Sequence, residues 1–308
     1  MRRRLPKSAM TRTAIVCVAL LVNGCAAQVW GTPPAAEDTP RATVVAPQAS
    51  LPALPEAPPT PPASFDGLDA RVRQATADAA ASGANIETVV LDRDTGQTVS
   101  NGNNKPFPIA SVVKLFIADD LLLQESEGKT KLSAADRQSL NVMLRSSDDT
   151  AAQNFWDRSG QNAIIARVKA RYGLAGTTAP YNGHWDVTQS TASDLVRYYD
   201  MLLNGTGGLP PEQANVIIDN LAQSTPTGTD GYPQRFGIPE GLYAEPVAVK
   251  QGWFCCWSGA NQLHVSTGII GPDRRYVMAI GSLDPTSAAA ARENMTQAVK
   301  TMFPGGRI

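Results

Sequence analysis

Histidine, cysteine and aromatic residues are scarce in this chain. Its 308 residues include two histidines, four cysteines and 6% aromatic residues, and one of the cysteines, Cys17, lies in the N-terminal leader described below. Zinc and iron–sulfur sites draw their ligands mainly from histidine and cysteine side chains. We therefore predict no metal site and no cofactor.

An excess of positive charge is absent as well. Lysine and arginine number 27 against 28 acidic residues, a formal net charge of −1. The first 24 residues hold five of the basic residues and no acidic ones, so the rest of the chain carries 22 − 28 = −6. A chain of that charge lacks the attraction for phosphates that nucleic-acid binding requires, which excludes nucleic acid as a partner.

The apolar run near the N-terminus is too short to span a bilayer. It extends from Ala14 to Val22 behind five basic residues, so residues 1–24 are predicted to be a signal peptide. Val22-Asn23-Gly24-Cys25 resembles a bacterial lipobox, which implies a lipidated Cys25 that anchors an extracytoplasmic protein to the membrane. Cleavage near Ala26 and secretion is the alternative. The basic leader is compatible with general and with twin-arginine export.

Proline is concentrated in one segment. Ten of the 23 prolines fall between Pro33 and Pro62, and residues 25–64 are also rich in alanine and threonine. Such a segment cannot bury enough apolar area to fold, so we predict a disordered tether. At ~3.1 Å per residue in polyproline II, about 40 residues would reach on the order of 120 Å. Residues 65–308 are enough for one domain with its own core.

The apolar periodicity within residues 65–308 predicts strands at both ends and helices between them. Predicted helices are 68–81, 111–123, most of 134–204 apart from a loop at 175–189, and 288–302; predicted strands are 86–92, 98–101, 247–253, 262–270 and 276–283. This order of elements indicates an α+β domain with two lobes.

Ser111 and Lys114 form a Ser-x-x-Lys motif at the start of an apolar helix. The spacing of three places the lysine on the same helix face as the serine, one turn further along. Apolar neighbours predict a buried lysine whose pKa is lowered toward that of a general base. Such a pair also arises by chance in chains of this composition, so the motif needs support from elsewhere in the sequence.

Two further motifs give that support. Ser147-Asp148-Asp149 precedes an amphipathic helix, and Lys250-Gln251-Gly252 lies on a predicted strand. In this order, the three motifs resemble Ser-x-x-Lys, Ser-Asp-Asn and Lys-Thr-Gly of the serine β-lactamase and penicillin-binding protein superfamily. The resemblance to class A β-lactamases runs from Phe65 to the C-terminus. It implies a β-lactamase/transpeptidase-like fold, in which N- and C-terminal strands form an antiparallel sheet beside an all-helical lobe.

The resemblance also implies a role for each motif residue. Ser111 would be the acylated nucleophile, Lys114 its base or proton relay, and Ser147 the shuttle that carries a proton to the leaving nitrogen. Lys250 would tune Ser147 and attract the substrate carboxylate, and the N–H groups of Ser111 and Trp253 would form the oxyanion hole. The implied ligand is a β-lactam or a D-alanyl peptide of the peptidoglycan type.

Departures from the family pattern concern substrate binding and deacylation. Asp149 replaces an asparagine and Gln251 replaces a threonine, while Gly252 and Trp253 complete the predicted substrate-binding strand. The loop 175–189 lacks the glutamate that activates the deacylating water in β-lactamases of this type, and Asp186 is its only acid. We therefore expect slow deacylation. A catalytically inactive module that binds cell-wall peptide is the alternative.

Three further features have open interpretations. His264 lies seven residues before Gly271, where several β-lactamases of this type carry an arginine, so it is either an anion-binding side chain or a half-exposed strand histidine. Cys255 and Cys256 form either a vicinal disulfide or two free thiols. Asp119-Asp120 is expected to be solvated or to cap a helix.

Overall fold

The computed structural model describes residues 65–308. The predicted signal peptide, the lipidation site Cys25 and the tether lie outside these residues. Within residues 65–308, no helix combines the length and the apolar character needed to cross a membrane.

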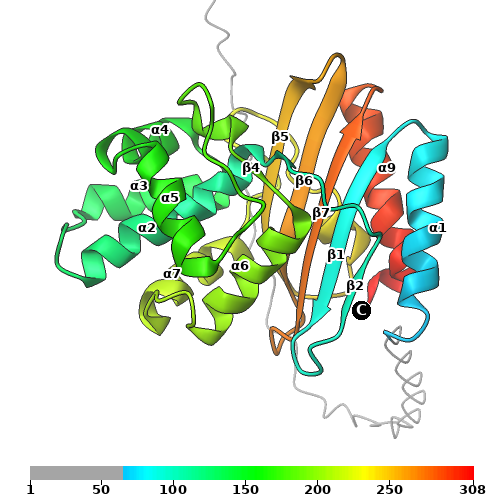
Figure 1. Ribbon diagram of the computed structural model, residues 1–308, viewed down its shortest axis with the longest axis horizontal. Helices are drawn as coiled ribbons and strands as arrows, with labels where there is room; N and C mark the ends of the chain where they lie inside the picture. Colours follow the sequence, from blue (N-terminus) through cyan, green and yellow to red (C-terminus); the bar gives the residue numbers. More distant parts are fainter. Residues whose placement is uncertain (1–64) are drawn as a thin grey trace, which may run out of the picture. The chain divides into compact units, whose positions relative to one another are not determined.

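A five-stranded antiparallel sheet joins the two ends of the described chain (Figure 1). Its strands follow the order β2-β1-β7-β6-β5, with bounds β1 (Asn85–Asp92), β2 (Thr98–Ser100), β5 (Val247–Trp257), β6 (Asn261–Ile270) and β7 (Tyr276–Asp284). Strand β1 pairs with β7, so that Val89 lies opposite Ala279. The predicted α+β fold is confirmed, and β5 forms one edge of the sheet.

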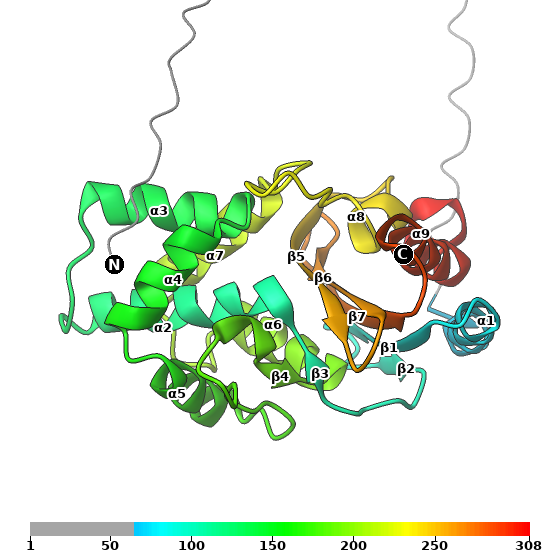
Figure 2. The same ribbon diagram turned by 90° about the horizontal axis from the view of Figure 1, so that it is seen from above.

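One face of the sheet is covered by α1 (Leu68–Ala81), α8 (Ile238–Gly241) and α9 (Ala288–Met302), as Figure 2 shows. Val72 of α1 and Val299 of α9 are fully buried in the same hydrophobic cluster as Ile86 and Ile280 of the sheet. Because helices cover both faces, β6 and β7 are buried at nearly every position.

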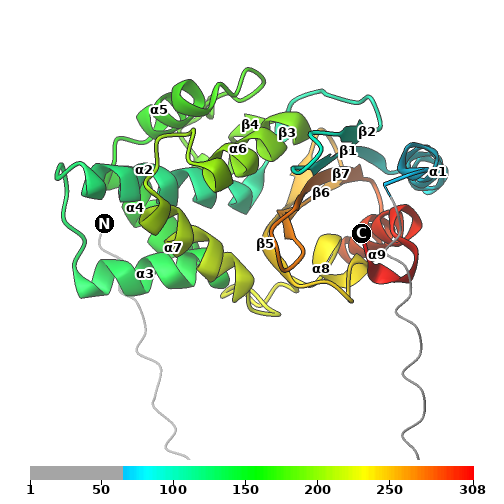
Figure 3. The ribbon, with the colours of Figure 1, turned by 90° about the horizontal axis from the view of Figure 1, so that it is seen from below.

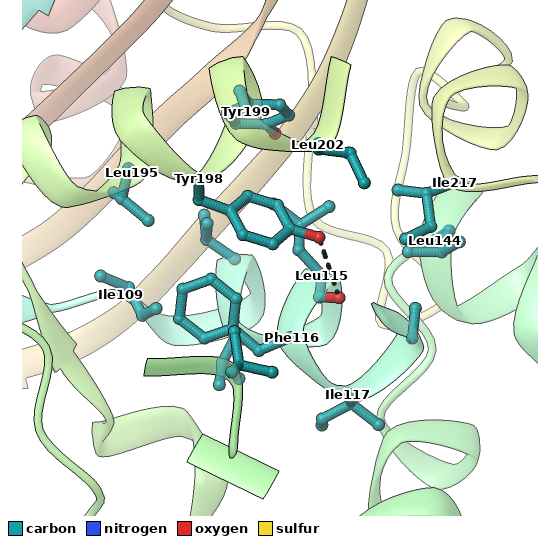
Figure 4. Close-up of a cluster of buried hydrophobic side chains, with 14 of the residues drawn as sticks. Ile109, Leu115, Phe116, Ile117, Leu144, Leu195, Tyr198, Tyr199, Leu202 and Ile217 are labelled. Carbon is teal, nitrogen blue, oxygen red and sulfur yellow. Dashed lines mark hydrogen bonds between the residues drawn. The ribbon is translucent and has the colours of Figure 1, made fainter. Parts of the chain in front are cut away.

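The opposite face of the sheet contacts α6, and the other helices of the helical lobe surround α2 (Figure 3). The bounds are α2 (Lys114–Ser126), α3 (Ala134–Arg145), α4 (Asp149–Arg158), α5 (Asn162–Tyr172), α6 (Ala192–Asn204) and α7 (Pro211–Ala222). Phe116 of α2 packs edge-to-face on Tyr198 with 5.1 Å between ring centroids. The Tyr198 hydroxyl donates to the carbonyl oxygen of Leu115 at 3.4 Å (Figure 4).

The acidic pair on α2 is buried and ion-paired, so the expected solvated or capping role is wrong. Asp119 accepts hydrogen bonds from Tyr172 at 2.5 Å and from Arg171. Asp120 accepts two from Arg167, both at 2.7 Å. Since α2 is enclosed by other helices, any carboxylate on it needs a partner, and α5 supplies the arginines.

The segment before α2 differs from the prediction. We expected one helix from Ser111, whereas a 3₁₀ turn, η1 (Ala110–Val113), precedes α2. Two short strands that the sequence did not predict, β3 (Phe107–Pro108) and β4 (Gln189–Ser190), pair with each other. They connect the segment that leads into Ser111 to the end of the loop 175–189.

Glu87 of β1 is a buried acceptor for the segments on either side of the β3–β4 pair. The side chain is 3% exposed, and its Oε1 accepts a hydrogen bond from the backbone N–H of Ala192 at 2.6 Å. The other carboxyl oxygen, Oε2, has no hydrogen-bond partner among the described residues. Burial raises the pKa of Glu87 to about 7, against the opposing effect of the backbone N–H groups of Ala192 and Lys105.

This raised pKa predicts a pH-dependent contribution to stability. An unfolded glutamate takes up its proton near pH 4.5, so the folded state holds the extra proton between about pH 4.5 and 7. The contribution of Glu87 to the free energy of unfolding is fully present below that window. It falls by about 3 kcal/mol as the pH rises through the window. In chemical denaturation, the free energy of unfolding of Glu87→Gln should therefore rise by about this amount relative to that of the wild type between pH 4.5 and 7.5. A constant difference would contradict the prediction.

Candidate active site

Ser111 lies in the turn η1, which packs against the edge strand β5. A Cβ at Gly252 of β5 would lie 2.5 Å from the carbonyl oxygen of Ile109, so a side chain at this position would push the turn away. Ala110 has a left-handed backbone with φ 46°, which costs a non-glycine residue on the order of 1 kcal/mol. The function of Gly252 in this structure is thus the close approach of β5 to the serine turn.

Lys114 is the first residue of α2 and is fully buried. Its Nζ donates to Ser111 Oγ at 2.8 Å and to the carbonyl oxygen of Ser147 at 2.7 Å, and it lies 3.3 Å from Ser147 Oγ. The ring of Trp185 lies on another side, with its centroid 4.7 Å from Nζ. The lysine therefore contacts both serines. The Ser-x-x-Lys spacing predicts its contact with Ser111, and the resemblance to the family implies its contact with Ser147.

Ser147 and Lys250 complete the group. Lys250 Nζ donates to Ser147 Oγ at 2.9 Å, and its side chain is 1% exposed. Ser147 has φ 57°, the second left-handed non-glycine residue of the site. Asp148 accepts a hydrogen bond from the N–H of Ala151 at 2.7 Å and so caps α4, which holds Ser147 just outside the helix.

Burial lowers the pKa of both lysines. For Lys114 the desolvation is opposed mainly by the nearby Asp149 carboxylate. For Lys250 the positive charge of Lys114 adds to the effect of burial, and its pKa falls well below that of an exposed lysine. In each lysine the lowered pKa favours the neutral amine, which is the form that can accept a proton from a serine hydroxyl.

Asp149 binds the general-base candidate. Lys114 Nζ donates to Asp149 Oδ1 at 2.5 Å, while the Asp149 side chain stays 67% exposed toward solvent. A carboxylate can accept hydrogen bonds from the lysine but, unlike an amide, has no N–H to donate to a substrate carbonyl. Its negative charge also favours the protonated form of Lys114.

A cleft of about 510 Å³ opens over Ser111. Its walls come from η1, α4, the loop 175–189, the loop before α8 and the distal half of β5. Asp186 and Trp185 of the short turn η2 (Trp185–Val187) lie on one wall. A backbone bridge between Thr178 and Gln189 closes the base of their loop.

Gln251 is turned away from the cleft. Its side chain is 1% exposed, and Nε2 donates to the carbonyl oxygens of Gln234 at 3.0 Å and Phe236 at 2.7 Å. The expected contact of the Gln251 side chain with substrate is therefore not present. Instead the amide fastens β5 to the segment that leads into α8.

His264 also lies outside the cleft, and both interpretations of it need correction. It is fully buried, so it is not a half-exposed histidine, and burial lowers its pKa to about 4, so it carries no charge for an anion at neutral pH. Its Nε2 lies 2.6 Å from the Tyr232 hydroxyl, and Phe236 packs edge-to-face on the ring. This side of β6 faces the segment around α8.

Trp253 and the cysteine pair occupy the distal part of β5. Trp253 and Cys255 line the cleft, and the structure joins Cys255 to Cys256 by a disulfide.

Asp230 and Tyr232 are among the cleft residues that sequence reasoning missed. Trp253 Nε1 donates to Asp230 Oδ2 at 3.1 Å, and the Tyr232 ring stacks on Trp253 with 4.9 Å between centroids. Both residues lie in an irregular segment between α7 and α8, where no periodicity indicates which side chains face inward. The turn residues Thr229-Asp230-Gly231 were the available signal.

Comparison with known proteins identifies the family to which this chain belongs. The family model of the beta-lactamase enzyme family, Beta-lactamase2, matches residues 68–136 and 134–303. The chain belongs to the Beta-lactamase2 family. One sequence relative is lipoprotein LppW of Mycobacterium tuberculosis. It is 62% identical to this chain over 249 residues, which cover 81% of this chain and 79% of LppW.

Solved structures share the fold of the Beta-lactamase2 chain. A β-lactamase from Chitinophaga pinensis superposes with a TM-score of 0.62 at 15% identity, over 75% of this chain and 97% of that one. The protein PBP-A gives a TM-score of 0.62 at 18% identity, over 77% of this chain and 94% of its own. At these identities the likeness concerns the fold alone.

Proposed function

We propose that this protein forms an acyl-enzyme at Ser111 with a β-lactam or a D-alanyl peptide. The observation that carries the proposal is the continuous chain of contacts from Ser111 Oγ to Lys114 Nζ, Ser147 Oγ and Lys250 Nζ. The three contacts measure 2.8, 3.3 and 2.9 Å, close to the reach of a proton transfer, and the Ser111 end of the chain lines the cleft. The fold of the Beta-lactamase2 family and the order of the three motifs support the same chemistry.

In the proposed acylation, Ser111 Oγ attacks the carbonyl carbon of the ligand and its proton moves to the neutral Lys114 amine. The N–H groups of Ser111 and Trp253 stabilise the negative oxygen of the tetrahedral intermediate. When the C–N bond breaks, the proton passes from Lys114 through Ser147 Oγ to the leaving nitrogen. Lys250 stabilises the Ser147 oxygen while the proton moves.

A binding module without turnover is the second candidate function. Asp149 and Gln251 favour it, because neither provides the polar group that the family motifs direct at a substrate. In that case the cleft would hold cell-wall peptide while Ser111 stays unmodified.

Labelling with a fluorescent penicillin distinguishes the two. We expect a covalent band for the wild type, none for Ser111→Ala, and an unchanged band for Ser100→Ala, because Ser100 lies on β2 at the opposite edge of the sheet from β5. Peptide mass mapping should place the adduct on Ser111. Failure of every β-lactam and D-alanyl ester to give an adduct would favour the binding module.

We also propose an extracytoplasmic lipoprotein anchored through Cys25. The support is the lipobox-like sequence and the 62% identity to a protein named as a lipoprotein. The wild-type protein should enter the detergent phase and carry a diacylglyceryl mass at Cys25, because acyl chains supply the membrane anchoring. Cys25→Ala should be recovered in the soluble fraction, and its recovery with the membranes would contradict the proposal.

A further inference from the structure

The cleft over Ser111 is negatively charged. Asp149, Asp186 and Asp230 all line it, and none of its lining residues within 65–308 is a lysine or an arginine. Asp186 and Asp230 have no salt bridge to a basic side chain in the described part of the chain. An anionic ligand group would meet repulsion at these two carboxylates.

The two lysines of the site do not offset this charge at the cleft surface. Lys114 is already paired with Asp149 at 2.5 Å, and Lys250 is 1% exposed behind Ser147. Both amino groups therefore face the two serines rather than the opening of the cleft, whichever protonation state they have.

An aromatic surface lies next to one of the carboxylates. Tyr232 and Trp253 stack with their planes 9° apart, and the indole N–H of Trp253 holds the Asp230 carboxylate at 3.1 Å. The Tyr232 hydroxyl is held by His264, and the Arg292 guanidinium lies over the Tyr232 ring, 4.8 Å from its centroid. The contact with a cationic ligand group therefore falls to Trp253. Because the indole N–H lies in the ring plane, Asp230 lies at the edge of the Trp253 ring. An ammonium group over the ring face next to that edge gains a charge pair and a cation–π contact together.

We propose that Asp230 and Trp253 form a subsite for a cationic group of the acyl donor, which makes an amine-bearing D-alanyl peptide the substrate class. This inference rests on the proposed acyl transfer at Ser111. Asp149 also favours a ligand with N–H groups, because a carboxylate accepts hydrogen bonds from them. The charge of the acyl donor, rather than its terminal carboxylate, is then the main source of selectivity at this wall.

The test is equilibrium binding to Ser111→Ala, which keeps the cleft but forms no adduct. The probes are Nα-acetyl-lysyl-D-alanyl-D-alanine and its Nε-acetylated and Nε-succinylated forms. We expect the free amine to bind about tenfold more tightly than the neutral peptide, the succinylated peptide to bind most weakly, and the preference to shrink at high salt.

Variants of the subsite locate the effect. In the Ser111→Ala background, Asp230→Asn and Trp253→Leu should each reduce the preference for the amine about threefold. Trp253→Phe should retain most of it, and Asp219→Asn, which removes an exposed carboxylate of α7, should leave it unchanged. Equal binding of the three peptides, tighter binding of the succinylated form or no binding at all would overturn the subsite. A charge preference in Ser111→Ala together with an unlabelled wild-type Ser111 would overturn only the acyl transfer.

Discussion

A penicillin adduct on Ser111 should persist for minutes or longer. Acylation has its nucleophile, base and proton relay, whereas deacylation has no glutamate in the loop 175–189. Asp186 lines the cleft, but its carboxyl group stands on a side chain one methylene shorter than that of glutamate. Loss of a positioned general base slows such a step by a factor of ~10² to 10⁴. Intact-protein mass spectrometry after removal of free penicillin should show the adduct decaying slowly.

Two substitutions at Asp186 test the cause. Asp186→Glu extends the carboxylate by one methylene and should shorten the adduct lifetime if reach is the missing element. Asp186→Asn keeps the size of the side chain but removes the base, so it should leave the already slow decay unchanged. Rapid decay in the wild type, or a longer lifetime in Asp186→Asn, would identify Asp186 as a working base.

Asp149→Asn should accelerate acylation and move its pH dependence. The carboxylate raises the pKa of Lys114, so its removal lowers that pKa further below the usual lysine value. If neutral Lys114 is the base, the acylation rate rises as the pH rises through this pKa, and the variant should reach the same rate at a lower pH. At pH 7 we expect a rate roughly tenfold higher, to which the new amide N–H adds a donor for the ligand carbonyl.

Stopped-flow labelling with a penicillin between pH 5.5 and 9 measures this shift. Asp157→Asn is the matched control, because it removes a carboxylate from the same helix α4 at an exposed position that has no contact with Lys114. An unmoved pH profile in Asp149→Asn would show that Asp149 does not determine the protonation of Lys114.

Local patterns in the sequence determined the elements and the order of the motifs. The helices 68–81 and 288–302 are confirmed at the predicted bounds, because apolar periodicity and turn residues are local signals. Ser111 and Lys114 share one stretch of chain, so their contact follows from helical spacing alone. The start of α2 was less predictable, since the 3₁₀ turn depends on the packing of η1 against β5.

Tertiary structure alone decided which side chains face the cleft and which are buried. His264 and Gln251 lie on strands that are covered on both faces, so alternation could not show that the segment around α8 covers their side chains. Asp230 reaches the cleft from an irregular loop, and Asp119 finds Arg171 52 residues away. A carboxylate next to an arginine and one next to an indole look alike in sequence. Their charge and exposure depend on neighbours that only the packing of distant segments brings together.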